Sequence, residues 1–135
     1  MRKYAREVCL DLVFEYLFNG VEQTELDAEL FDTEKLTDED KTYLFGVYHG
    51  VVEQKEALKN VIAEYARGYS ADRIFKVDFA ILLVAVYELL YTDTPAPVVI
   101  NEAADLAKKF SAEKSVSFVN GILAAVYKAN KGENE

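Results

Sequence analysis

The 135-residue sequence contains little of what cross-links, kinks or breaks a chain: one cysteine, two prolines and six glycines. A single cysteine, Cys9, excludes a disulfide framework and zinc sites of the usual spacing, and we expect it to pack in the core. The scarcity of glycine and proline argues against an all-β fold with many tight turns. Because 51% of the residues are hydrophobic, the chain can bury a sizeable core and is not expected to be disordered.

The sequence also lacks the motifs of most enzymes and of membrane proteins. It has no glycine-rich nucleotide loop and no Cys-x-x-Cys motif, and its only histidine, His49, has no catalytic or metal-binding context. We therefore predict no enzymatic activity, no cofactor and no metal site. The longest apolar run, residues 79–87, is far shorter than the roughly 20 residues that span a membrane. The expected location is the cytoplasm.

The net charge of −9 is unfavourable for a general nucleic-acid binder, but its distribution matters more than its size. Between Glu22 and Asp40 the chain carries nine acids and a single base, Lys35, which accounts for −8 of that charge. We interpret this acidic segment as a solvated surface. The rest of the chain is close to neutral, so a modest basic site elsewhere remains compatible with the composition.

Hydrophobic periodicity predicts an all-α fold with six or seven helices. The first helix is expected over residues 3–18, followed by Gly20 as its stop. We expect a short helix over residues 25–31, and then a long helix over residues 38–65 that opens with Thr37 and Asp40 as a capping box and bends near residues 54–55.

The later part of the chain contains the most apolar predicted helix, over residues 71–91. Because it is apolar nearly all round, it should be buried on all sides at the centre of the core. We expect one domain over residues 1–135. It divides into an N-terminal half, about 1–68, a C-terminal half, about 69–130, and a polar tail, 131–135.

Two amphipathic helices joined by a tight turn are predicted over residues 95–123, with Ser111 or Ser115 as the N-cap of the second helix. The joint carries more than packing requires, because three lysines lie close in sequence to the aromatic Phe110. These lysines are Lys108, Lys109 and Lys114. Phe110 has two interpretations from sequence, a stacking surface for a base or a core residue that closes its helix.

Residues of mixed chemistry recur in a fixed order along this stretch, which helical patterning alone rarely produces. They are Asp93, Pro95, Ile100, Asn101, Glu102, Ala103, Leu106, Ala107, Lys108, Phe110, Glu113, Ser115, Phe118, Val119, Asn120 and Gly121. The pattern continues upstream at Ala5, Arg6, Glu7, Leu10, Phe14, Arg73, Ile74, Val77, Asp78, Ala80, Ile81, Leu82, Tyr87, Glu88 and Leu89. With these residues the chain resembles the NusB family of transcription antitermination factors over nearly its whole length.

The resemblance implies a helical bundle in two packed halves and a non-catalytic function. NusB proteins bind the boxA element of RNA transcripts together with NusE, which is also a small-subunit ribosomal protein. The pair joins an RNA polymerase complex that resists termination. The implied partners of this chain are therefore boxA RNA, NusE and the polymerase complex, without DNA or a membrane.

The resemblance and the local chemistry together suggest which residues take part. The candidate RNA-binding residues are Arg2, Lys3, Arg6, Lys108, Lys109, Phe110 and Lys114. Arginine and lysine would contact phosphates, and Phe110 would stack on a single-stranded base. Lys108 and Lys109 are weaker candidates because Asp105 can pair with either along its own helix. Phe14 and Asp78 match family positions that face NusE.

Two other functions compete with this interpretation. One is a helical adaptor that binds only protein, which the acidic charge and the few basic residues favour. The other is a free-standing relative of the helical RNA-binding domain that precedes the catalytic domain in some ribosomal RNA cytosine methyltransferases. Binding to boxA RNA, with and without NusE, distinguishes these functions.

Overall fold

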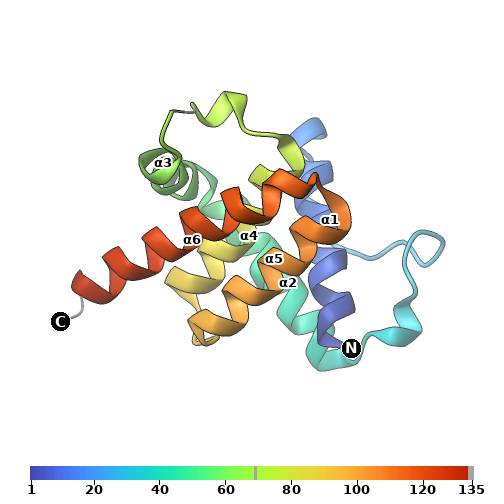
Figure 1. Ribbon diagram of the computed structural model, residues 1–135. Coiled ribbons are helices and arrows are strands. Elements are labelled where there is room, and N and C mark those ends of the chain that lie inside the picture. Colours follow the sequence, from blue (N-terminus) through green and yellow to red (C-terminus); the bar gives the residue numbers. More distant parts are fainter. Residues whose placement is uncertain (69, 134–135) are drawn as a thin grey trace.

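The computed structural model describes residues 1–68 and 70–133. Over these residues the chain forms six α-helices, two short 3-10 helices and no strand, which confirms the all-α prediction (Figure 1). The α-helices are α1 (Arg2–Asn19), α2 (Asp38–Glu53), α3 (Lys55–Tyr65), α4 (Lys76–Tyr91), α5 (Ala96–Phe110) and α6 (Glu113–Glu133). The 3-10 helices are η1 (Thr33–Lys35) and η2 (Ala71–Arg73).

Local sequence signals set several of the helix ends. Gly20 ends α1 with a left-handed backbone (φ 68°), and its N–H donates to the Tyr16 carbonyl at 2.9 Å. Thr37 and Asp40 form the predicted capping box, with the Asp40 N–H donating to the Thr37 hydroxyl at 3.0 Å. The predicted bend between α2 and α3 lies at Gln54, whose backbone leaves the helical region.

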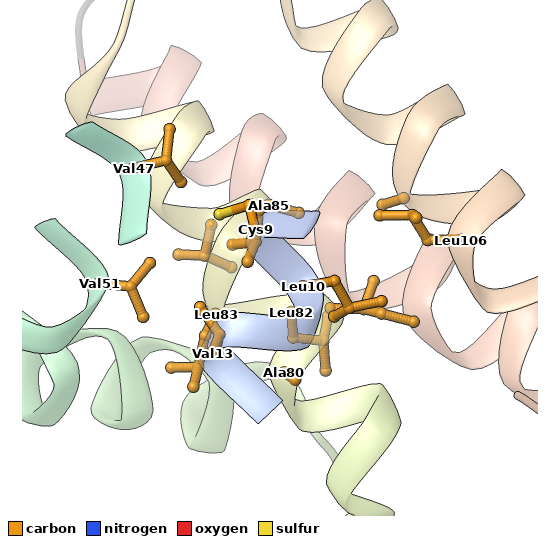
Figure 2. Close-up of a cluster of buried hydrophobic side chains, with 14 of the residues drawn as sticks. Cys9, Leu10, Val13, Val47, Val51, Ala80, Leu82, Leu83, Ala85 and Leu106 are labelled. Carbon is orange, nitrogen blue, oxygen red and sulfur yellow. The ribbon is translucent and has the colours of Figure 1, made fainter. Parts of the chain in front are cut away.

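Helix α4 is the centre of the core, as its composition predicts. It packs against all five of the other α-helices, and its residues 78–86 are all buried. Figure 2 shows Leu82 and Leu83 of α4 surrounded by side chains from several helices. These neighbours include Cys9, Leu10 and Val13 from α1, Val47 and Val51 from α2, and Leu106 from α5. Burial on every side explains why α4 shows almost no polar face.

The acidic segment departs from the prediction, because residues 25–31 do not form a helix. The Asp27 side chain accepts a hydrogen bond from the Glu29 N–H at 2.8 Å, and the N–H groups of Leu30 and Phe31 both turn back to the Asp27 carbonyl. A short polar side chain that bonds its own backbone competes with helix formation, so the segment makes a single turn. In Figure 1 this loop extends away from the bundle between α1 and α2.

Two other boundaries differ from the sequence-based prediction. Helix α4 begins at Lys76 instead of residue 71, because Phe75 is extended (ψ 132°) and Ile74 is buried. Helix α6 continues to Glu133, so the predicted polar tail begins within a helix. Tyr69, at the predicted boundary between the halves, and residues 134–135 lie outside the described residues.

The glycines of α2 have different surroundings. A Cβ atom at Gly50 would lie 2.2 Å from Cζ of Tyr87, so only glycine allows α2 to approach α4 this closely. A Cβ at Gly46 would meet nothing within 4 Å. Close packing of α2 against α4 therefore requires glycine at position 50 and not at position 46.

Candidate nucleic-acid interface

Helices α1 and α5 are joined by two ion pairs between residues that lie 102 positions apart in sequence. Lys3 Nζ lies 3.3 Å from a carboxylate oxygen of Asp105, and the Lys109 ammonium pairs with Glu7. Asp105 therefore pairs across the helices with Lys3, not with a lysine of its own helix as the sequence suggested. The two pairs bring residues from both ends of the chain onto one surface, where α5 lies beside α1 in Figure 1.

Phe110 ends α5 on this surface, and 41% of the residue is exposed. The Lys109 ammonium lies 5.3 Å from the centre of its ring. This exposure excludes the interpretation of Phe110 as a core residue, and it leaves part of the ring accessible for stacking. We call Lys3, Lys108, Lys109 and Phe110 the α1–α5 face, because all four are exposed on these helices. An exposed ring beside cations is the arrangement that binds single-stranded bases.

Arg2 lies at the start of α1, next to α2. Its Nε is 3.3 Å from Asp40, and its guanidinium is 4.2 Å from the centre of the Tyr43 ring. The N-terminal ammonium of Met1 also donates to Asp40, and this hydrogen bond holds the pKa of that carboxyl far below its usual range. Arg2 is half-exposed, so it can reach solvent anions, but Asp40 already neutralises part of its charge.

Arg6 departs from the expectation that it contacts RNA. Only 8% of its side chain is exposed, and its Nε lies 3.6 Å from an oxygen of the buried Glu88. The Tyr43 hydroxyl donates to the other carboxylate oxygen of Glu88, and the Arg6 guanidinium lies 5.2 Å from the Tyr43 ring centre. Here the positive charge of Arg6 neutralises the buried Glu88 carboxylate, so it is not available to bind a phosphate in solvent. We assign Arg6 a structural role instead.

The Arg6–Glu88–Tyr43 cluster was not recognised in the sequence, although a signal for it was present. Glu88 and Asp78 are the only charged residues between Val77 and Leu90 of α4, and a buried charge needs a partner. Burial, with a smaller contribution from Glu88, raises the pKa of the Tyr43 hydroxyl and of the Cys9 thiol far above their usual ranges. The thiol therefore stays protonated and unreactive in the core.

Asp78 is buried below the joint between α5 and α6, with 5% of the residue exposed. The hydroxyls of Ser111 and Ser115 donate to its two carboxylate oxygens at 2.5 and 2.7 Å. Neither serine therefore acts as the predicted N-cap, because both fix the joint onto α4. Asp78 still borders a cavity of about 290 Å³, which Lys114 also lines. The structure thus brings a predicted RNA-binding residue close to a predicted partner-binding residue.

Phe14 belongs to an aromatic surface where α1 meets the start of α4. Its ring packs edge-to-face on Phe18 with centroids 5.0 Å apart, and the Lys76 ammonium lies 4.9 Å from the Phe18 ring centre. Phe18 and Phe75 expose 64% and 66% of their surfaces. Sequence reasoning did not single out either residue. Phenylalanine side chains that are this exposed are typical of surfaces that bind another protein.

Comparison with known proteins gives the family. A model described as the NusB family matches residues 3–128. The chain belongs to the NusB family. Transcription antitermination protein NusB of Ruminiclostridium cellulolyticum is 35% identical over 130 residues, which cover 96% of this chain and 90% of that protein.

Solved structures agree with this assignment. NusB of T. maritima matches with a TM-score of 0.83 at 30% identity, covering 95% of this chain and 91% of that chain. The NusB-family fold also matches a chain in a crystal structure of the antitermination factors NusB and NusE in complex with dsRNA. There the TM-score is 0.77 at 29% identity, over 95% of this chain and 96% of that chain. Within the described residues, no helix is both long and apolar enough to cross a membrane.

Proposed function

We propose that this NusB-family protein is a non-catalytic transcription antitermination factor that binds boxA-like RNA together with NusE in the cytoplasm. The observation that carries the proposal is the match, over 95% of the chain, to a fold solved in complex with NusE and RNA. The α1–α5 face supports it, because Lys109 lies beside the exposed Phe110 ring and Lys3 of α1 pairs with Asp105 of α5. The pair would act by joining an RNA polymerase complex that resists termination.

In this proposal the protein binds RNA through a few phosphate contacts and one stacked base, without a large basic surface. Lys3, Lys108 and Lys109 contact phosphates, Phe110 stacks on a base, and Arg2 and Lys114 extend the path at either side. The acidic segment over residues 22–40 bears most of the net charge and supplies none of these residues. A site with so few cations binds weakly and with a shallow salt dependence, about −0.7 in log–log slope for each phosphate of single-stranded RNA.

NusE would bind the aromatic surface around Phe14, with Phe18 as an exposed anchor. Asp78 would contribute by holding the α5–α6 joint in place and by bordering the adjoining cavity. Because Lys114 lines the same cavity, NusE bound there lies next to the RNA path. This arrangement predicts that NusE increases RNA affinity by completing one continuous surface.

The test measures fluorescence anisotropy of labelled boxA-like RNA and of a scrambled RNA across a salt series, with and without NusE. We expect weak binding by the protein alone and a marked preference for boxA once NusE is present. Equal affinity for both RNAs at every salt concentration would contradict RNA recognition and favour the protein-only adaptor.

Two variants separate the contributions of charge and stacking. Lys109→Ala should lower affinity and flatten the salt slope by about 0.7, which corresponds to one phosphate contact. Phe110→Ala should lower affinity by about 1–3 kcal/mol without changing the slope, because stacking releases no counterions. Lys131→Ala and Tyr91→Ala are matched controls at exposed positions outside the face, and both should leave binding unchanged.

A further inference from the structure

A groove of about 620 Å³ lies between the end of α3 and one side of α6. Its lining residues are Tyr65, Ala66, Arg67, Ser117, Phe118, Gly121, Ile122, Ala125, Lys128 and Ala129. None of them belongs to the α1–α5 face, and none is a candidate RNA- or partner-binding residue. The antitermination function proposed above therefore leaves this surface unexplained.

The chemistry of the groove is apolar with cations at its edges. Ala66 and Ile122 are buried and Ala125 is half-buried, and these residues line its apolar part together with the aromatic residues Tyr65 and Phe118. Among the described residues that line the groove, Arg67 on one side and Lys128 on the other carry charge, and both are exposed. No carboxylate lines the groove among the described residues, although the protein as a whole carries a net charge of −9. The groove therefore suits a ligand that is apolar and negatively charged.

The length of the groove along α6 suits a short helix. Its lining on α6 runs from residue 117 to residue 129, which at 1.5 Å per residue is about 18 Å, or about three helical turns. A helix laid in such a groove inserts apolar side chains at every third or fourth position and directs its polar side chains to the edges. RNA fits less well, because two cations contact few phosphates.

We propose that the α3–α6 groove binds an amphipathic helix of a partner protein whose apolar side faces Ile122 and Ala125 and whose carboxylates pair with Arg67 and Lys128. This binding site shares Phe118 with the cavity that Asp78 and Lys114 border, but it contains none of the residues proposed to bind RNA or NusE. If the groove binds no helix, the proposed antitermination function still stands. If the antitermination function is wrong, the proposed helix-binding groove still stands.

Gly121 offers a way to block the groove without disturbing the fold. A Cβ atom at this position would meet nothing within 4 Å, so Gly121→Leu adds a side chain to open space in the groove. Leucine also has a higher helix propensity than glycine, so the variant should fold. Gly46→Leu is the matched control, because a Cβ there also meets nothing and the position lies in α2, outside the groove.

The probe is a synthetic 15-residue helical peptide with leucines on one side and glutamates on the other, and a control peptide carries lysines in place of the glutamates. Binding is measured by anisotropy and located by amide chemical-shift changes in the isotopically labelled full-length protein. We expect the glutamate peptide to bind and to shift the amides of Gly121, Ala125 and Arg67. Gly121→Leu should weaken binding about tenfold or more, and Gly46→Leu should not.

Charge reversal tests the electrostatic part of the proposal. The double variant Arg67→Glu with Lys128→Glu should lose affinity for the glutamate peptide and gain affinity for the lysine peptide. RNA binding with NusE should stay unchanged in this double variant and in Gly121→Leu. No binding of the glutamate peptide, shifts located elsewhere, or equal binding of both peptides by the wild type would each overturn the proposal.

Discussion

Replacing Arg6 with methionine should strongly destabilise the protein, because it leaves the Glu88 carboxylate buried without a positive partner. Methionine keeps most of the apolar contact of the arginine stem, so the change tests the charge more than the volume. The two side chains are only 8% and 2% exposed, so water cannot replace the lost partner. Breaking a buried ion pair by removing one member costs about 3–5 kcal/mol.

A loss of this size is easily measured. With a urea m-value of about 2 kcal/mol/M, about 4 kcal/mol lowers the unfolding midpoint by about 2 M. The assay is a urea melt at neutral pH followed by circular dichroism, with the m-value checked for each variant. Arg2→Met is the matched control, because Arg2 lies one helical turn earlier and is half-exposed. It should lose no more than about 1 kcal/mol.

A double-mutant cycle assigns the loss to the pair. Glu88→Leu alone should also destabilise, since it leaves Arg6 buried and unpaired. The combination Arg6→Met with Glu88→Leu should be much more stable than the sum of the single changes predicts, because an apolar pair often replaces a buried ion pair at little cost. Adding Tyr43→Phe should restore a further part, about 1–3 kcal/mol, by removing the hydroxyl that loses its acceptor.

One result would refute this reasoning. If Arg6→Met melts within about 1 kcal/mol of the wild type and flattens the RNA salt slope by about 0.7, Arg6 contacts a phosphate and does not neutralise Glu88.

Four further predictions concern the core, the α5–α6 joint, the glycines of α2 and the acid range. Leu82→Ala should cost about 2–5 kcal/mol in a denaturant melt, because this side chain is fully buried in α4. Asp78→Ala should cost about 2–5 kcal/mol in the same melt, since two serine hydroxyls lose their charged acceptor, and NusE binding should fall with it. Gly50→Ala should destabilise by steric conflict with α4, whereas Gly46→Ala should stabilise by about 1 kcal/mol, as thermal melts of both will show. Folding holds the pKa of Asp40 below its unfolded value of about 3.9, so the stability it contributes is present above that value and is lost as the pH falls below it. Asp40→Asn should therefore be less stable at neutral pH and should show a weaker fall in stability between about pH 4 and 2.

Each of these predictions can fail in a recognisable way. A loss below about 0.5 kcal/mol for Leu82→Ala would place α4 at the surface. Unchanged melting of Asp78→Ala with lost NusE binding would make Asp78 a direct partner contact. Equal changes in thermal stability for Gly50→Ala and Gly46→Ala would contradict the steric conflict between position 50 and α4. The control for Asp40→Asn is Asp38→Asn, because Asp38 is an exposed acid in the first turn of the same helix. Parallel stability–pH curves for the two variants would exclude a special role for Asp40.

The sequence by itself determined the all-α class and the position of the central helix, although not the absence of a helix over residues 25–31. Residues 79–86 contain no charged residue, and only burial on all sides is compatible with such a helix. The stop at Gly20 and the capping box at Thr37 are local, because each depends on hydrogen bonds within one turn of the chain. The resemblance to the NusB family could also be found from sequence alone, because it consists of residue types in a fixed order along the chain.

Only the tertiary structure decided which charges remain available for binding. Arg2 and Arg6 lie one helical turn apart, yet Arg6 faces the buried Glu88 and Arg2 reaches solvent. Asp105 could have paired with a lysine of α5, and it pairs with Lys3 of α1 instead. Spacing along a helix fixes only which residues are neighbours within that helix. Partners from distant segments depend on how α1, α4 and α5 pack together, and this packing is determined by side chains along the whole chain.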